Sequence, residues 1–223
     1  MNNSSLHRPI FGLALCWSAA CAQSQEAFFS LPSWETPSSL VLVSPMDMEN
    51  WQLGAYVGRY NHARLRDFAI FPLRHFGDWD HGYMVALDAS CSLAHLPHVP
   101  LDVELDINVS YHFGEGSFFE FATAPMFRWK WFPWNNLVYT TYRTGPFGAS
   151  YTTGLSSLEE TDTAGGHTTR FLNLYLAEWT FSKDKQAPWE VFLRVHHRSG
   201  IYGRIDDVHG GSNYPSVGWR SHF

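Results

Sequence analysis

Three polar residues near the end of the chain have the types and spacing that acyl transfer requires. His197 and Ser199 are two positions apart, and Asn213 follows after a glycine-containing stretch. A serine hydroxyl is a weak nucleophile until a base takes its proton, and in a strand a histidine at i−2 lies on the same face as the serine. Their Cβ atoms are then about 6.5–7 Å apart. The two side chains must therefore adopt rotamers that point toward one another, or the strand must bend, which Gly200 permits. Asn213 could orient the imidazole or donate to an oxyanion.

The stretch between the serine and the asparagine offers further groups. Asp206 and Asp207 are alternative partners for orienting the imidazole. Gly210 and Gly211 could present backbone N–H groups, although glycines in such a stretch are first of all turn residues.

The sequence predicts neither a metal site nor a cofactor. His196, His197 and His209 are the residues that suggest a metal, but adjacent residues of a strand point to opposite faces. The chain also contains no nucleotide-binding glycine loop.

The elements that must position these residues alternate between apolar and polar residues with a period of two. In Leu101–Phe113 the odd-numbered positions are apolar, and the even-numbered positions are polar: Asp102, Glu104, Asp106, Asn108, Ser110 and His112. A helix would spread those acids around its whole circumference, so the pattern predicts a strand.

We expect about eight such strands, the smallest size usual for a transmembrane barrel. The others begin near Trp51, Tyr83 and Phe119 and cover residues 136–143, 170–181, Trp189–Ser199 and 213–223. Residues 156–166, which contain consecutive acids and two adjacent glycines, are expected to form a loop. The predicted fold class is all-β, an antiparallel outer-membrane type of barrel.

Composition favours a membrane barrel over a soluble barrel or sandwich. Aromatic residues make up 17% and charged residues only 16% of the chain, against roughly 25% charged in typical globular proteins. The net charge of −6 argues against a nucleic-acid partner. A helical membrane protein is excluded, because no run of about 18 apolar residues follows the N-terminus.

In a membrane barrel the polar faces line the interior. We expect acids there to pair with bases from other strands, among them Asp102, Glu104 and Asp106 with Arg128, Lys130 and Arg194. The chain ends on Phe223, with Trp219 and Val217 on the same strand face, like the C-terminal signal of outer-membrane barrels.

Strand parity then places the polar triplet toward lipid. In Trp189–Ser199 the row that contains Val191, Leu193 and Val195 continues into His197 and Ser199, while His196, Arg194 and Arg198 face the interior. Both termini of an even-stranded barrel lie in the periplasm, so His197, Ser199 and Asn213 should cluster at the outer leaflet. Polar groups directed at hydrocarbon cost free energy unless they are paired or functional. The alternative is that they mark where the strands enter the headgroup zone.

The N-terminus predicts export. His7 and Arg8 precede an apolar run, and Ala20-Cys21-Ala22 is a small-x-small cleavage site, so we expect a signal peptide over residues 1–22. A buried N-terminal helix and a lipoprotein cut before Cys21 are the alternatives. We expect an irregular lead-in over residues 23–50 and one barrel domain over residues 51–223. Removal of the signal leaves Cys91 alone, with no partner for an internal disulfide.

The end of the chain resembles the lipid A 3-O-deacylases of the PagL type. The residues that carry the resemblance are His196-His197-Arg198-Ser199-Gly200, residues 210–213 and the terminal strand. The resemblance implies an eight-stranded outer-membrane barrel with His197 as base and Ser199 as nucleophile. The chain departs from the family at Gly200, where an asparagine is usual, and it has no glutamate between Ser199 and Phe223 to orient the histidine.

The sequence therefore predicts an outer-membrane serine esterase that removes an ester-linked acyl chain from lipopolysaccharide. Ser199 would attack, His197 would move the proton, and Asn213 or Asp207 would orient or stabilise. Its partners would be lipid A and outer-membrane lipid, and a homodimer is compatible with the pattern. The alternatives are a non-enzymatic structural or adhesive barrel and a narrow pore, although eight strands leave an interior that side chains fill.

Overall fold

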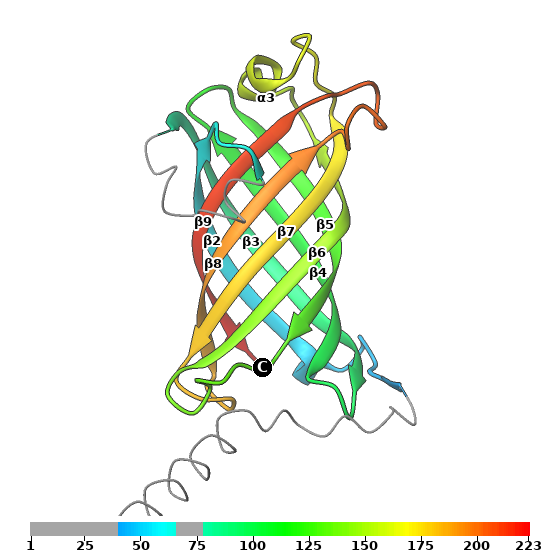
Figure 1. The fold of residues 1–223 in the computed structure, drawn as a ribbon, viewed down its shortest axis with the longest axis vertical. Helices are drawn as coiled ribbons and strands as arrows, with labels where there is room; N and C mark the ends of the chain where they lie inside the picture. Colours follow the sequence, from blue (N-terminus) through cyan, green and yellow to red (C-terminus); the bar gives the residue numbers. More distant parts are fainter. Residues whose placement is uncertain (1–39, 66–77) are drawn as a thin grey trace, which may run out of the picture. The chain divides into compact units, whose positions relative to one another are not determined.

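The structure is a computed structural model that describes residues 40–65 and 78–223, and in it the chain forms a closed antiparallel barrel of eight long strands (Figure 1). The strands are β2 (Trp51–Asn61), β3 (Trp79–Leu96), β4 (Leu101–Phe113), β5 (Phe118–Trp129), β6 (Tyr139–Thr152), β7 (Phe171–Ser182), β8 (Trp189–Ser199) and β9 (Gly211–His222). Each pairs with the next along the chain, and β2 pairs with β9 to close the ring. The predicted all-β antiparallel barrel is confirmed.

The barrel has two different ends (Figure 1). The end that we call the α3 end contains the short helix α3 (Ser157–Asp162) and the connections that follow β2, β4, β6 and β8. The opposite end, which we call the terminal end, contains the C-terminus and the turns at residues 97–100, 130–138 and 183–188. A two-residue strand, β1 (Val41–Leu42), pairs with the last residues of β3, and a 3₁₀ turn, η1 (Met48–Asn50), precedes β2. Ser199 and Gly211 therefore face one another at the α3 end.

Two strands, β4 and β8, begin and end at the predicted residues, but β6 does not. It covers Tyr139–Thr152 rather than residues 136–143. Its start is delayed because the Asn135 side chain accepts from the Thr140 amide (3.1 Å) and donates to the Lys130 carbonyl (2.9 Å), which closes a turn. Its second half escaped prediction because the register shifts between Gly145 and Gly148, and this bulge interrupts the alternation.

The expected loop over residues 156–166 contains helix α3. The Ser156 hydroxyl accepts a hydrogen bond from the Glu159 amide at 3.3 Å, which is the usual capping contact at a helix N-terminus. Leu158 and Glu159 are buried.

Parity divides β4 and β8 as expected. On β4, Asp106 is buried and Ile107 is 39% exposed, and on β8 Arg194 is buried and Leu193 is 56% exposed. Within the described residues no helix or second sheet covers the apolar outer face of β8.

The interior is crosslinked by buried ion pairs, as the sequence predicted. Arg128 pairs with Glu104 at 2.6 Å, Lys130 with Asp102 at 2.6 Å, and Arg194 with Asp106 at 2.9 Å. Glu178 lies at the centre of the network and bonds three fully buried arginines: Arg143, Arg194 and Arg220. Removing one partner from such a network leaves an uncompensated buried charge, which costs about 3–5 kcal/mol.

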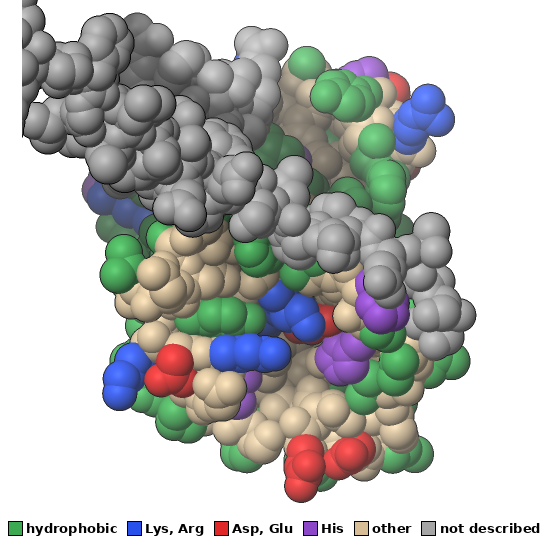
Figure 2. Space-filling view, turned by 60° about the horizontal axis from the view of Figure 1, so that its bottom comes forward, with side chains coloured by type: hydrophobic (Ala, Val, Ile, Leu, Met, Phe, Trp, Pro, Cys, Tyr) green, Lys and Arg blue, Asp and Glu red, His purple; other side chains and the backbone are tan. Residues whose placement is uncertain are grey.

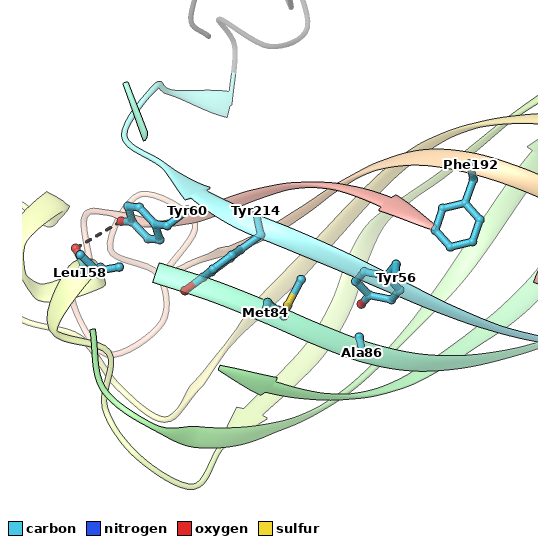
Figure 3. Close-up of a cluster of buried hydrophobic side chains, with 7 residues drawn as sticks. All are labelled: Tyr56, Tyr60, Met84, Ala86, Leu158, Phe192 and Tyr214. Atoms are coloured by element: carbon cyan, nitrogen blue, oxygen red, sulfur yellow. Dashed lines mark hydrogen bonds between the residues drawn. The ribbon is translucent and has the colours of Figure 1, made fainter. Parts of the chain in front are cut away.

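A cluster of buried apolar and aromatic side chains extends through the interior toward the α3 end, beside buried polar groups such as Glu120 and Arg198. Tyr56, Tyr60, Met84, Ala86, Leu158, Phe192 and Tyr214 form one buried cluster (Figure 3). The Tyr60 hydroxyl donates to the Leu158 carbonyl at 3.2 Å. Helix α3 therefore packs onto the barrel mouth and fixes the strand ends on which the polar triplet lies.

Large apolar side chains cover the outside of the barrel. Those that are at least half exposed include Val57, Leu87, Phe119, Phe121, Phe171, Leu193 and Val217. Seen obliquely from the terminal end, green hydrophobic side chains recur along the outline, and Lys, Arg and His side chains lie both near the middle and at a few places on the edge (Figure 2). A soluble monomer rarely exposes more than a few hundred Å² of contiguous apolar surface. Among the described helices, none is long and apolar enough to cross a membrane.

The expected signal peptide, residues 1–22, lies outside the described residues. So does most of the expected lead-in over residues 23–50, of which residues 40–50 contain β1 and η1.

Candidate active site

The candidate nucleophile and base lie on the outward face of β8, near its end. His197 and Ser199 are half-buried, whereas their neighbours His196 and Arg198 are buried inside the barrel. Strand β9 places Asn213 directly opposite His197 and Gly211 opposite Ser199. The register thus brings His197 and Asn213 together, as parity predicts.

The His197 ring is held in one tautomer. Its Nδ1 lies 2.8 Å from Asn213 Oδ1 and 3.0 Å from the Ser212 carbonyl oxygen. Both partners are acceptors, so Nδ1 carries the proton and donates it. The other ring nitrogen, Nε2, then keeps its lone pair, and this is the protonation state that a general base needs.

The orientation of the Asn213 amide is fixed from its other side. Its Nδ2 donates to the Ala63 carbonyl at 2.8 Å, so Oδ1 is the atom turned to the histidine. Ala63 belongs to the segment that follows β2, and its own amide donates to Asn61 Oδ1 at 2.8 Å. The three contacts form one chain from β2 to β8.

The Ser199 hydroxyl makes no hydrogen bond to any described residue, His197 included. Two residues of extended strand separate the Cβ atoms by about 6.5–7 Å, so a rotamer change must bring the two groups together. Hydrogen bonds between catalytic groups are often long or absent in unliganded sites and form when substrate binds.

A cavity of about 610 Å³ lies against this face. His197, Ser199 and Asn213 line it together with Asn173 from β7. The rest of the wall is mixed. It contains apolar side chains, which include Leu65, Phe147 and Ile201, and the polar residues His62, Arg64, Asp162 and His209. A concave site in which polar groups converge between apolar side chains suits a ligand that has both polar and apolar parts.

Sequence reasoning missed Asn173. The β7–β8 register places it opposite Ser199, it is only 8% exposed, and its amide donates to the Pro146 carbonyl at 3.4 Å. Asn173 also lines the cavity. The signal that would have identified Asn173 is the same as for His197 and Ser199: it is a polar residue in a strand row that is otherwise apolar and faces outward.

Asp207 is placed differently from the other predicted residues. Its exposed carboxylate accepts from His209 Nε2 at 3.1 Å, and it does not line the cavity. The alternative, Asp206, accepts a hydrogen bond from His167 Nε2 at its backbone carbonyl (3.0 Å). Of the three proposed orienting residues, Asn213 is the one that contacts His197.

The β8–β9 connection is strained. Ile201 (φ 50°), Tyr202 (φ 56°), Asp206 (φ 49°) and Asp207 (φ 57°) all occupy the left-handed region. For a β-branched residue such as Ile201 this is a true outlier, and such strain gathers at functional sites. Gly200 is required here, because a Cβ atom would overlap the Val208 carbonyl oxygen.

The inward-facing neighbours have structural roles. His196 Nε2 lies 2.9 Å from Glu120 Oε1, and Arg198 bonds Glu159 of α3 at 2.6 Å. Glu159 also accepts from the Ser212 hydroxyl at 2.6 Å, which supports the residue whose carbonyl contacts His197. In residues 40–65 and 78–223 no group of three or more His, Cys, Asp or Glu side chains is arranged to hold a metal ion.

The fold and the position of the site define the class: an all-β closed barrel of eight strands that resembles outer-membrane barrels. The chain is similar to the outer membrane enzyme PagL, with a TM-score of 0.52 and 15% identity over 77% of this chain and 99% of that one. It is also similar to Neisserial surface protein A (NspA), with a TM-score of 0.42 and 9% identity over 78% and 97% of the two chains. No protein-family model and no curated protein sequence matches the chain. At such identities the likeness concerns the fold alone.

Proposed function

We propose that the chain is an outer-membrane serine esterase that hydrolyses an ester-linked acyl chain of lipopolysaccharide in the outer leaflet. One observation carries the proposal: His197 Nδ1 lies 2.8 Å from Asn213 Oδ1 on the outward face of the barrel. A histidine that serves only as a headgroup-zone residue needs no such orientation. Here the lone pair of Nε2 is free beside a serine and a cavity.

The location supports a lipid substrate. The polar groups lie in rows whose other residues, such as Leu193 and Val217, are 56% and 54% exposed on the outer face. A substrate must therefore reach Ser199 from the membrane side. By the topology of even-stranded outer-membrane barrels, the α3 end is the extracellular end. The substrate is then a lipid of the outer leaflet, and lipopolysaccharide is the ester-bearing lipid that the resemblance to PagL implies.

The chemistry follows from the three side chains. Ser199 Oγ attacks the ester carbonyl carbon while His197 Nε2 takes the hydroxyl proton. When the tetrahedral intermediate collapses, the same nitrogen returns the proton to the leaving alkoxide. Water then attacks the acyl-enzyme with His197 again as base, which releases the fatty acid and restores Ser199.

A donor for the oxyanion is offered by the neighbouring strand β7, where Asn173 lies opposite Ser199 and lines the same cavity. A side-chain amide or backbone N–H in this position stabilises the negative charge that develops on the carbonyl oxygen.

The test is lipid A from Gram-negative cells that express the protein, analysed by mass spectrometry. We expect loss of one acyl chain with the parent and no loss with Ser199→Ala. Asp207→Ala serves as a matched change in the neighbouring loop and retains the mass loss if Asn213 is the orienting residue. Unmodified lipid A in cells that contain the folded parent barrel would refute the proposal.

The free Ser199 hydroxyl favours a second candidate, a structural or adhesive barrel that works through its outer loops. For that function His197→Ala leaves lipid A and cell phenotype unchanged, and exchange of the β6–β7 or β8–β9 connection alters binding to surfaces or ligands.

A further inference from the structure

His62, just beyond the end of β2, bonds a carboxylate with each of its ring nitrogens. Nδ1 lies 2.9 Å from the Asp162 carboxylate of α3, and Nε2 lies 2.9 Å from Asp80 Oδ2 of β3. A carboxylate can only accept, so both nitrogens must donate, and this requires the charged imidazolium. Neutral His62 can keep only one of the two bonds.

The surroundings of His62 favour its charged form. The groups that face it are Asp80 from β3, Asp162 from α3 and Tyr60 from β2, whose ring centroid is 5.2 Å away and whose hydroxyl donates to Asp162 at 2.8 Å. Burial lowers the pKa of His62, but the hydrogen bonds and charges of Asp162 and Asp80 outweigh it, so the pKa is raised above its ordinary value.

The next residue, Ala63, connects this ion pair to the candidate active site. The His62 amide donates to the Asp78 carbonyl at 3.0 Å, and the Ala63 amide donates to Asn61 Oδ1 at 2.8 Å. With its backbone and side chain both held, the segment presents the Ala63 carbonyl to Asn213 Nδ2 at 2.8 Å.

The direction of the Asn213 amide decides the tautomer that His197 prefers. If the amide turned over, Nδ2 would face His197 Nδ1, which would then have to give up its proton to act as acceptor. The proton would move to Nε2, and the base would be lost. The Ser212 carbonyl opposes this change from 3.0 Å, so the Ala63 carbonyl adds to an existing preference.

We infer that His62 is a positioning residue: bridged between Asp80 and Asp162, it holds the Ala63 carbonyl against Asn213 and so keeps His197 in the tautomer that can act as a base. The inference rests on the proposed function for its effect on turnover, but the effect on the His197 ring does not depend on any activity.

The experiment compares four purified full-length barrels in detergent micelles: parent, His62→Gln, His62→Lys and the control His167→Gln. His167 joins the β6–β7 connection to the β8–β9 connection through its bond to the Asp206 carbonyl. Within the described residues it makes no hydrogen bond or ion pair with the Ala63 segment. Selectively ¹⁵N-labelled histidine gives the tautomer of the His197 ring, which is assigned by the signal lost in His197→Gln. Hydrolysis of lipid A in the same micelles gives kcat, KM and their pH profiles.

We expect Nδ1-protonated His197 in the parent, in His62→Lys and in His167→Gln, and a mixture of tautomers in His62→Gln. We expect kcat of His62→Gln to fall about three- to tenfold, no more than removal of the Asn213 amide itself, with KM nearly unchanged. In the parent, kcat should decline at alkaline pH as His62 loses its proton, and His62→Lys should move that decline to higher pH. A role in stability alone would move neither the tautomer nor the pH profile.

An unchanged His197 tautomer and kcat in His62→Gln would overturn the inference. If the parent hydrolyses nothing but the tautomer still shifts in His62→Gln, the positioning contact stands and the esterase proposal fails. If the parent is active and His62→Gln matches it in tautomer and pH profile, the esterase stands and the positioning role fails.

Discussion

The Asn213 amide offers a graded test of the proposed mechanism. Asn213→Ala removes the acceptor that lies 2.8 Å from His197 Nδ1 and the donor that lies 2.8 Å from the Ala63 carbonyl. The ring keeps the Ser212 carbonyl at 3.0 Å as its second acceptor. One hydrogen bond between neutral groups contributes about 0.5–1.5 kcal/mol, and about 1.4 kcal/mol corresponds to a factor of ten in rate.

We therefore expect kcat/KM of Asn213→Ala to fall about tenfold. Ser199→Ala has no nucleophile and should lose all measurable hydrolysis. Asn213→Ala also leaves the buried Ala63 carbonyl unpaired, which should lower the free energy of unfolding by about 1–3 kcal/mol. The assay is fatty-acid release from lipid A in micelles by each purified barrel, with heat-dependent electrophoretic mobility as the measure of folding.

Two results would refute this reasoning. Parent-level kcat/KM in Asn213→Ala would mean that the amide does not orient His197. A complete loss of hydrolysis in a variant barrel that is still folded at the assay temperature would mean that Asn213 takes a direct part in the reaction rather than orienting the base.

Three further predictions concern the barrel around the site. Glu178→Gln removes the carboxylate shared by three buried arginines, and we expect it to lower the free energy of unfolding in vesicles by about 3–5 kcal/mol. A smaller loss of stability than that of Glu115→Gln, which changes an exposed carboxylate, would contradict a stabilising network. Leu193→Arg places a charge on the outer face of β8, and it should cost about 2–4 kcal/mol in vesicles if that face meets hydrocarbon, whereas an unchanged stability would contradict a membrane location. The stability that charged His62 contributes is fully present below the pKa that His62 has in the unfolded chain, and it is lost as pH rises through the raised pKa in the folded protein. The free energy of unfolding, measured between about pH 5 and 9, should therefore fall at alkaline pH in the parent, and this fall should be absent in His62→Gln.

Much of the barrel could be predicted because side-chain parity is a local property. Strand β4 alternates without interruption, β8 has Phe192 as one apolar residue on its polar inner face, and the predicted bounds of both strands are correct. In β6 the sequence Gly145-Pro146-Phe147-Gly148 forms a bulge, so one residue is out of phase and the alternation no longer marks the strand.

Helix α3 shows a different limit. Ser156 and Glu159 have the spacing of a helix cap, but six residues are too few for a periodic pattern. Its inward side is determined by Glu159, whose partners Arg198 and Ser212 come from other strands.

The same division holds for the candidate site. Parity and register place His197 beside Asn213, because both depend on strand periodicity. The contact between Asn213 and the Ala63 carbonyl joins residues far apart in the chain. Because every residue has a backbone carbonyl, the identity of residue 63 does not indicate this contact. Asp207 illustrates the converse, since a carboxylate near the serine in sequence bonds His209 instead.

The most direct test of the central claim is covalent capture of Ser199 in the purified barrel by an alkyl fluorophosphonate. The serine oxygen bonds to phosphorus, fluoride leaves, and His197 takes the hydroxyl proton, so the reaction reports an activated nucleophile whatever the natural substrate is. The account predicts a single modified peptide that contains Ser199, with labelling lost in both Ser199→Ala and His197→Ala. A folded parent barrel that stays unlabelled, or equal labelling in His197→Ala, would contradict it.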